Sequence, residues 1–359
     1  MVLSLGAAIM NSKVGGEKGR RTVSIVMPIR NEAGSIRTSL ETVLSQDYPL
    51  ELVEIIVADG MSEDGTQDIV REMAAHHVNV TLIENPGKIV STGLNAALAR
   101  AKGEVIVRID GHCKVTPEYV RRCVEHLEDD LVDGVGGSVD TKGMTRVARV
   151  IAVAMSSRFG VGGSAFRTTQ DRTMFVDTVP FAAYTREIIE QAGPYDEELV
   201  RNQDDEYNYR LRKLGANLLL AANIRSEYYS RSSFRSLWRQ YYQYGYWKVR
   251  VMQKHPWQMS LRQFVPALFV VALATSLLSV IFLGQRGLWI TDFLVGAYGL
   301  GNLVATLMSV NQLEISLLPL LPLAFATLHF SYGFGFLVGL FKFRNRWRHP
   351  SDQSKVQHA

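Results

Sequence analysis

The amino-acid sequence predicts an α/β catalytic domain with a mostly parallel, doubly wound sheet, followed by α-helices that span a membrane. In the first 110 residues, short apolar runs alternate with amphipathic segments, which is the pattern of strands that alternate with helices. Almost all long apolar runs lie after residue 264. Hydrophobic residues make up 47% of the 359 residues and charged residues 21%, and their uneven spread favours a soluble front half with a membrane-embedded tail.

Two strand and helix units open the chain. Residues 23–29 form an apolar run typical of a buried strand, and a polar loop that carries Glu32 leads from it into a helix with one apolar face. Residues 53–58 repeat the pattern and end at Asp59, before a loop whose side-chain oxygens can cap the next helix. The repetition indicates parallel strands joined by helices.

Two further strands complete the predicted sheet. Residues 80–83 lead through Lys88 to a third helix, and residues 105–109 form a fourth strand that ends at Asp110. Right-handed crossovers bring the carboxyl ends of parallel strands to one edge, where ligands bind in such sheets. We therefore expect four polar residues to converge at that edge: Glu32, Asp59, Lys88 and Asp110.

A carboxylate and an imidazole follow the fourth strand, separated by one glycine. Asp110 and His112 can point the same way and share a divalent cation, which can in turn neutralise a diphosphate. An ordinary Asp-Gly turn explains the same residues. The two common glycine-rich phosphate loops are absent from the sequence, so a nucleotide would have to be held by carboxylates, a lysine and a metal.

Charge and cysteine content narrow the class of protein. The net charge of +4 is too small to indicate nucleic-acid binding, but basic residues cluster in 225–262 and 342–348, on both sides of the apolar region, which points to a membrane surface. Cys113 and Cys123 have no metal-binding spacing, which fits a reducing cytoplasm. The apolar first ten residues lack a basic leader, so we expect no signal peptide.

Several motifs in order resemble the nucleotide-sugar-binding half of family 2 glycosyltransferases. They are VSIVMPIRNE at 23–32, VADG at 57–60 and DGH at 110–112. Three more resemble bacterial polysaccharide glucosyltransferases of the succinoglycan-biosynthesis kind: NPGK at 85–88, FGVGG at 159–163 and RNQDDEYNYRL at 201–211. The resemblance covers roughly residues 22 to 250 and implies a GT-A fold (Rossmann-like), a UDP-sugar donor and inversion at the anomeric carbon.

The resemblance also implies roles for single residues on the donor side. Asp59 would contact the base or ribose, with Pro28 and Glu32 as the pocket wall. Asp110 and His112 would bind the metal, and because His replaces the family's second Asp, Mn²⁺ becomes a better candidate than Mg²⁺. Lys88 would assist at the diphosphate, or it is a solvated loop lysine.

Three acids stand at the start of a helix that begins near Gln203. Acids at a helix N-terminus are common as caps. Inverting transfer, however, needs a carboxylate that takes the proton of the acceptor hydroxyl, and the resemblance places this base on Asp204, with Asp205 as the reserve. The glycines of 159–163 are expected in a flexible loop near the sugar.

Residues 232–255 predict an amphipathic helix with aromatic residues between basic ones, which suits the lipid headgroup layer. Part of it resembles the family element that caps the diphosphate and guides the acceptor, which makes Gln240 and Trp247 candidate substrate-binding residues. Interfacial anchoring explains both residues better than substrate binding does.

The apolar tail contains three segments long enough to span a bilayer, at 264–283, 289–310 and 313–341. Three crossings would place the basic run at 342–348 on the side away from the catalytic half. The positive-inside preference favours an even number, with one segment re-entrant or lying along the interface. Two or three crossings remain as alternatives.

The sequence thus predicts five regions and a function. The regions are an N-terminal extension (1–21), a GT-A catalytic domain (22–230), an interfacial amphipathic helix (231–262), transmembrane helices (263–341) and a basic polar tail (342–359).

The expected activity is metal-dependent transfer of a hexose, with glucose favoured, to a polyprenyl-diphosphate-linked oligosaccharide for a cell-surface polysaccharide. The expected location is the inner membrane, multi-pass, with the catalytic domain cytoplasmic, alongside other polysaccharide-assembly enzymes and without nucleic acid. The alternatives are a polyprenyl-phosphate sugar transferase and a non-catalytic GT-A scaffold.

Overall fold

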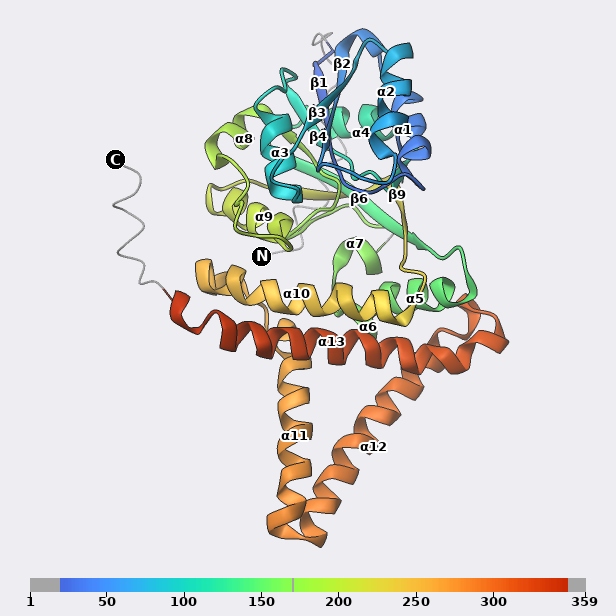
Figure 1. Ribbon diagram of the computed structural model, residues 1–359, viewed down its shortest axis with the longest axis vertical. Helices are drawn as coiled ribbons and strands as arrows, with labels where there is room; N and C mark the ends of the chain where they lie inside the picture. Colours follow the sequence, from blue (N-terminus) through green and yellow to red (C-terminus); the bar gives the residue numbers. More distant parts are fainter. Residues whose placement is uncertain (1–19, 170, 348–359) are drawn as a thin grey trace, which may run out of the picture.

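The computed structural model describes residues 20–169 and 171–347. These residues form two stacked parts (Figure 1): a sheet with its helices, and below it a layer of two long helices from which a helical hairpin projects. The expectations for the first ten residues and for the end of the basic tail lie outside the described residues.

The parallel half of the sheet forms as the apolar runs predict. Its strands lie in the order β3-β2-β1-β4 and pair in parallel. They are β1 (Val23–Ile29), β2 (Val53–Asp59), β3 (Val80–Glu84) and β4 (Val105–Arg108). The connecting helices are α1 (Ile36–Leu44), α2 (Thr66–His76) and α3 (Val90–Leu98). Ile25 packs in a core cluster with α1, and Val26 packs with α3 on the opposite face. Burial on both faces explains why β1 is apolar except for Ser24.

The second half of the sheet is mixed. Strands β4, β8 and β6 pair antiparallel, β6 and β9 pair in parallel, and β5 and β7 pair antiparallel with β9. These strands are β5 (Cys113–Val115), β6 (Gly134–Lys142), β7 (Met174–Phe175), β8 (Ala183–Thr185) and β9 (Leu218–Tyr229). The helices of this half are α4 (Tyr119–His126), α5 (Arg146–Ser156), α6 (Arg158–Val161), α7 (Ala165–Thr168), α8 (Arg186–Ala192) and α9 (Gln203–Lys213). The predicted α/β class is confirmed, but the sheet of the described residues is mostly parallel only as far as β4.

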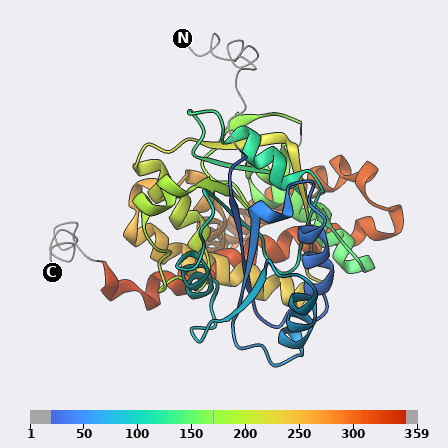
Figure 2. The same cartoon turned by 90° about the horizontal axis from the view of Figure 1, so that it is seen from above.

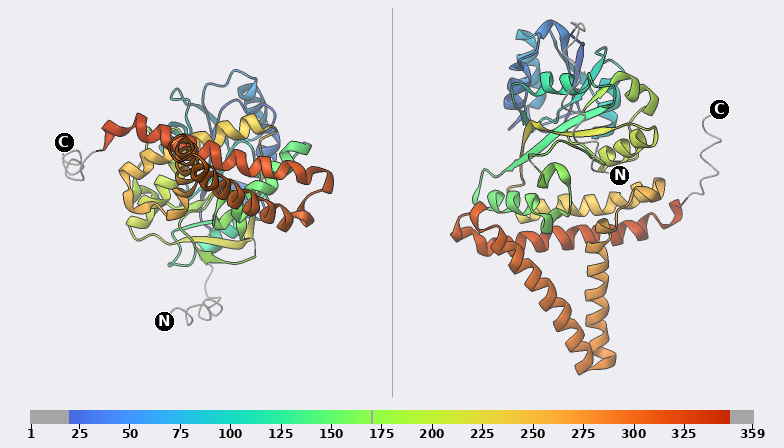
Figure 3. Two further views of the ribbon diagram at one scale, coloured as in Figure 1. Left: turned by 90° about the horizontal axis from the view of Figure 1, so that it is seen from below. Right: turned by 180° about the vertical axis from the view of Figure 1, so that it is seen from behind.

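The layer below the sheet consists of α10 (Phe234–Lys254) and α13 (Leu321–Lys342), which run side by side (Figures 1 and 3). Glycines allow the two backbones to approach closely. A Cβ atom added to Gly245 would lie 2.1 Å from the carbonyl oxygen of Tyr332, and one added to Gly335 would lie 2.1 Å from that of Tyr242. Seen from above, both ends of α13 extend beyond the sheet (Figure 2).

The hairpin of α11 (Val265–Leu283) and α12 (Gln285–Met308) projects away from this layer (Figure 3). In the described chain, three helical segments are long and apolar enough to cross a membrane: α11, α12 and residues 315–342. In the most apolar 18-residue stretch of each segment, 17% is buried inside the protein in α11 and in α12. In the third segment 50% is buried, because α13 packs along α10. The three segments therefore differ in how much apolar surface they leave for lipid.

Two sequence expectations change in this part of the fold. The apolar face of α10, including Leu237 and Val249, is buried by protein and does not face lipid. The glycine-rich segment expected near the sugar lies against α13. Phe159 packs edge-on against Phe325 with ring centroids 5.1 Å apart, and a Cβ added to Gly160 would lie 2.0 Å from the carbonyl oxygen of Ala154. Close packing explains that glycine better than flexibility does.

Candidate active site

Asp59 is held rigidly at the end of β2. Its carboxylate accepts hydrogen bonds from the backbone N–H of Ser62 (2.9 Å), from the Ser62 hydroxyl (2.5 Å) and from the Gln67 side chain (2.5 Å). The residue is buried and pairs in register with Ile29 at the end of β1. Its donors come from the loop and helix that directly follow it, so its position depends on local sequence.

The loops after the first three strands meet at the predicted edge. Arg30 donates to the carbonyl oxygen of Lys88 at 3.4 Å, although the two are 58 residues apart in sequence. Each of these loops holds a non-glycine residue with positive φ, at Asn31, Met61 and Lys88, and such strained residues concentrate at functional sites. Pro28 lies in the buried part of β1, against α3.

His112 is oriented by Glu32. Its Nδ1 lies 2.9 Å from Glu32 Oε1, so an Nδ1–H that donates to the carboxylate leaves Nε2 with a lone pair for a metal. Gly111 makes this arrangement possible, because a Cβ there would lie 2.8 Å from Ile29 Cγ2 and 3.3 Å from Glu32 Cγ. Burial lowers the His112 pKa, but the hydrogen bond and charge of Glu32 and the charge of Asp110 outweigh it and raise the pKa above its usual value.

Asp110, the other predicted ligand, forms a two-point ion pair with Arg108. Nε of the guanidinium lies 3.0 Å from Oδ1 and Nη2 lies 3.3 Å from Oδ2. Both side chains are mostly buried. Burial lowers the Arg108 pKa, but the charges of Asp110 and Asp204 outweigh it and raise the pKa, so Arg108 interacts electrostatically with the predicted metal ligand and with the predicted base. The sequence reasoning missed Arg108, and its signal was a charged residue inside an otherwise apolar strand.

The three acids at the start of α9 have different surroundings. Asp205 forms an ion pair with Lys248 of α10, and Glu206 accepts hydrogen bonds from Arg210. Asp204 is open to solvent, and no side chain of the described residues forms a hydrogen bond or ion pair with its carboxylate. Partial burial and the charge of Asp205 raise the Asp204 pKa, while Arg108 and Lys248 lower it, with a net upward shift. Of the two candidate bases, Asp204 is the one available to a substrate.

The side chain of Tyr228 lies between the side chains of Gln240 and His112 and contacts both. The amide nitrogen of Gln240 donates to the hydroxyls of Tyr228 (3.1 Å) and Tyr244 (3.0 Å), and its oxygen accepts from Arg231 (3.3 Å). The Tyr228 ring packs edge-on to His112 with centroids 5.5 Å apart. Tyr228, Tyr244 and Arg231 were not singled out from the sequence, because β9 and α10 bring them together only in the folded chain.

Trp247 has different neighbours. Its indole N–H donates to Gln243 at 3.1 Å, and its ring packs against Tyr246 and Phe343. These contacts connect α10 to the end of α13 and do not involve the residues around His112.

Comparison with known proteins identifies the family. The model of the family described as Glycosyl transferase family 2 matches residues 24–193. The succinoglycan biosynthesis protein ExoA of Rhizobium meliloti (strain 1021) is 30% identical over 325 residues, which cover 90% of this chain and 96% of that protein. The chain belongs to glycosyltransferase family 2.

Other similar proteins agree with this family. A dolichyl N-acetyl-alpha-D-glucosaminyl phosphate 3-beta-D-2,3-diacetamido-2,3-dideoxy-beta-D-glucuronosyltransferase of Methanococcus voltae is 27% identical over 328 residues, 89% of this chain and 97% of that protein. Among solved structures, the mannosyltransferase PcManGT from Pyrobaculum calidifontis, in complex with GDP-Man and Mn²⁺, has a TM-score of 0.56 and 19% identity and covers 90% of this chain and 88% of its own. That similarity supports the GT-A fold.

The residues present fit a divalent cation that is shared with a substrate. Among the described residues, no group of three or more His, Cys, Asp or Glu side chains forms a closed metal site. Asp110 and His112 supply one carboxylate and one imidazole, which suit Mn²⁺ or Mg²⁺ when phosphate oxygens and water complete the shell.

A separate hollow of about 720 Å³ is lined by residues that include Glu227 and Tyr229. These residues alternate with Tyr228 along β9, so the hollow lies on the strand face away from His112.

Proposed function

We propose that this glycosyltransferase moves a hexose, with glucose favoured, from a UDP-sugar to a polyprenyl-diphosphate-linked oligosaccharide, with inversion at the anomeric carbon. The observation that carries the proposal is that Asp204 keeps an open carboxylate while its two acidic neighbours are paired. The relatives support the substrate class, since one is named for succinoglycan biosynthesis and another for transfer to a dolichyl-linked sugar.

The proposed reaction is a single displacement. The acceptor hydroxyl oxygen forms a bond to the anomeric carbon while the bond from that carbon to the diphosphate oxygen breaks, and UDP leaves with the electron pair. Asp204 takes the proton of the hydroxyl on its carboxylate. Its raised pKa makes it a stronger base than an ordinary aspartate, as long as the pH keeps it ionised.

The donor-side residues of this chain orient the nucleotide and the leaving group. Asp59 and Pro28 would form the nucleoside pocket, and Lys88 would approach the diphosphate from the loop after β3. Asp110 and His112 would hold Mn²⁺ or Mg²⁺, with Glu32 fixing the imidazole. When bound, the cation neutralises charge on the departing diphosphate.

On the acceptor side, Gln240 orders the tyrosine hydroxyls next to His112, which supports the proposed diphosphate cap. Trp247 would act as an anchor between α10 and α13, and its described contacts support this role over substrate binding. Gln240 and Trp247 therefore have different proposed roles, although they lie on the same helix.

We further propose that α11 and α12 cross the inner membrane while α13 lies along its cytoplasmic surface, with the catalytic domain in the cytoplasm. Three observations support this arrangement: the low burial of α11 and α12, the packing of α13 along α10, and an ion pair of 2.8 Å between Arg346, just beyond α13, and Glu198 of the catalytic half. The basic end of α13 then stays on the cytoplasmic side, as the positive-inside preference requires. The catalytic unit would be residues 22–230 and the interfacial helix 231–262.

Two experiments test the proposed function. Cells that lack the protein should accumulate a lipid-linked intermediate one sugar short, and its mass identifies the donor and the acceptor together. The full chain in nanodiscs should then extend this intermediate with a UDP-sugar and lose that activity when EDTA removes the metal. Failure to release UDP from any UDP-sugar, with or without metal, would favour a non-catalytic scaffold.

A further inference from the structure

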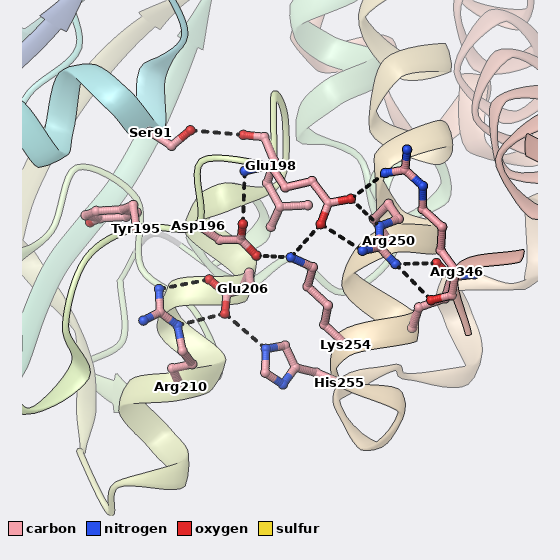
Figure 4. Close-up of polar contacts among 12 residues, drawn as sticks. Ser91, Tyr195, Asp196, Glu198, Glu206, Arg210, Arg250, Lys254, His255 and Arg346 are labelled. Atoms are coloured by element: carbon pink, nitrogen blue, oxygen red, sulfur yellow. Dashed lines mark hydrogen bonds and ion pairs between the residues drawn. The ribbon is translucent and has the colours of Figure 1, made fainter. Parts of the chain in front are cut away.

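The loop that leads into α9 is tied to the donor side of the site. We call residues 195–202 the base loop, because Asp204 follows it directly. Asn95 of α3 accepts from the Tyr195 backbone N–H at 2.7 Å and donates to its carbonyl oxygen at 2.9 Å. Ser91, also on α3, donates to the carbonyl oxygen of Leu199 at 3.2 Å (Figure 4). Hydrogen bonds from α3 therefore hold the base loop at two points, Tyr195 and Leu199.

Three basic side chains bind Glu198 of the base loop, and they come from what we call the membrane-associated layer, namely α10, α13 and the residues just after α13. Glu198 accepts two hydrogen bonds from Arg250, at 2.9 and 2.7 Å, and contacts Lys254 and Arg346 at 2.8 Å each (Figure 4). Hydrogen bonds from Arg250 and Lys254, with their charges, lower the Glu198 pKa to about 2 against the opposing effect of burial. Arg250 and Lys254 belong to α10 and Arg346 follows α13, so one carboxylate joins the base loop to both helices.

Helix α10 also contacts the residues on either side of Asp204. Asn202, with a positive φ of 61°, donates its side-chain amide to the Tyr244 carbonyl oxygen at 2.9 Å. Lys248 of α10 pairs with Asp205, and His255, which directly follows α10, lies 3.0 Å from Glu206. Contacts from α10 therefore fix the chain before and after the proposed base, while its own carboxylate stays unpaired with described side chains. This is the arrangement expected of a reactive group held by its neighbours.

We infer that Glu198 is a positioning residue for the proposed base: it holds the base loop and the first turn of α9 against α10 and the end of α13. The inference rests on the proposed function, since it takes Asp204 as the base. It means that the acceptor side of the site is complete only when the membrane-associated helices are in place. The donor side needs no such contact, because Asp59 and Glu32 are held by residues of the sheet and its loops.

The inference can be tested by comparing the ion pairs of Glu198 with a second ion pair that also joins the catalytic half to the C-terminal helices. Glu314, in the connection from α12 to α13, pairs with Arg149 of α5 and so also joins the catalytic half to the membrane segment. Its ion pair involves no residue of the base loop, and the side chains of Glu314 and Arg149 are each about half exposed. Glu314→Gln therefore controls for a general loss of attachment, and Glu198→Gln reports on the base loop.

We expect Glu198→Gln in the full chain to lower kcat by about 10-fold or more, because small displacements of a reacting group are costly. The KM for the UDP-sugar should stay within about twofold, Glu198→Asp should recover part of kcat, and Arg346→Met should give a smaller loss in the same direction. Glu314→Gln should match the wild type. Equal kcat losses in Glu198→Gln and Glu314→Gln, or an unchanged kcat in Glu198→Gln, would overturn the inference.

Hydrogen exchange separates failure of this inference from failure of the proposed function. If the wild-type chain transfers no sugar, the proposed function fails, but the base loop can still be measured. Glu198→Gln should speed amide exchange in residues 195–206 and leave residues 59–67 unchanged, whereas Glu314→Gln should change neither. Unchanged exchange in 195–206 would contradict the positioning role even in an active enzyme.

Discussion

The donor side and the acceptor side of this site are held together in different ways. On the donor side, Asp59 takes its hydrogen bonds from residues three and eight positions further along the chain. On the acceptor side, Asp205 and Glu198 are held by cations 43 and 52 residues away, on α10. Under the proposed function, this difference means that nucleotide binding depends on the sheet edge alone, whereas transfer also depends on how α10 and the end of α13 hold α9.

The largest expected effect is on the base itself. Asp204→Asn should lower kcat by about 10² to 10⁴-fold, because it removes the group that takes the hydroxyl proton. UDP-sugar binding, measured by calorimetry, should not change. A mild loss of turnover would instead favour transfer to a polyprenyl phosphate, which needs no strong base.

The same substitution should not destabilise the fold. The Asp204 pKa is raised in the folded state, so this group favours folding below its unfolded pKa, and that contribution is lost as pH rises through the folded pKa. At neutral pH the ionised carboxylate is therefore unfavourable, and Asp204→Asn should keep or raise the melting temperature. A lower melting temperature would mean that the carboxylate has a structural partner.

The next effect should be confined to the donor side. Glu32→Gln weakens the hydrogen bond that orients His112, and second-shell changes of this kind typically cost about 10 to 100-fold in metal affinity. Mn²⁺ binding can be followed by electron paramagnetic resonance with UDP present. Glu41→Gln, on the neighbouring helix α1, is the control. Equal Mn²⁺ affinity in both variants would remove Glu32 from the metal's surroundings.

A smaller effect should appear in the pH dependence. Activity should fall as pH drops through the raised Asp204 pKa, because the base must be ionised. Arg108 lowers that pKa, so Arg108→Gln should move the acid limb of the kcat profile to higher pH. The other groups that interact electrostatically with Asp204 are Asp205, Lys248, Tyr184, Tyr195 and Tyr244. An acid limb that stays in place would show that Arg108 acts on Asp110 alone.

The smallest effect should distinguish two residues of α10. Gln240→Ala removes three hydrogen bonds beside His112 and should lower kcat/KM for the acceptor. Trp247→Phe keeps most of its packing and should leave kcat/KM within about twofold, as expected of an anchor. Equal losses in acceptor kinetics would bring Trp247 back into the substrate site.

The sequence predicted the parallel half of the sheet well because its signals are local. Mostly apolar runs at 23–29 and 53–58 marked β1 and β2, and the polar residues after each strand were expected to meet at one edge. The mixed half was not predicted, because β5, β7 and β8 have only two or three residues, too few to show a period.

The contacts of the acceptor side could not be found in the sequence. Glu198 and Arg346 are 148 residues apart, and neither belongs to a recognisable motif. The position of α13 could not be predicted either, because an apolar segment of that length suits a membrane crossing as well as burial against α10. Gly160 was expected in a mobile loop, since sequence does not distinguish a flexible glycine from one that allows close packing.

The most direct measurement is a structure of the full chain in a nanodisc with Mn²⁺ and a non-transferable UDP-sugar. The account predicts that the cation contacts Nε2 of His112 and the carboxylate of Asp110, and that the Asp204 carboxylate faces the anomeric carbon from the side opposite the diphosphate. A nucleotide bound away from His112, or an anomeric carbon turned away from Asp204, would contradict it.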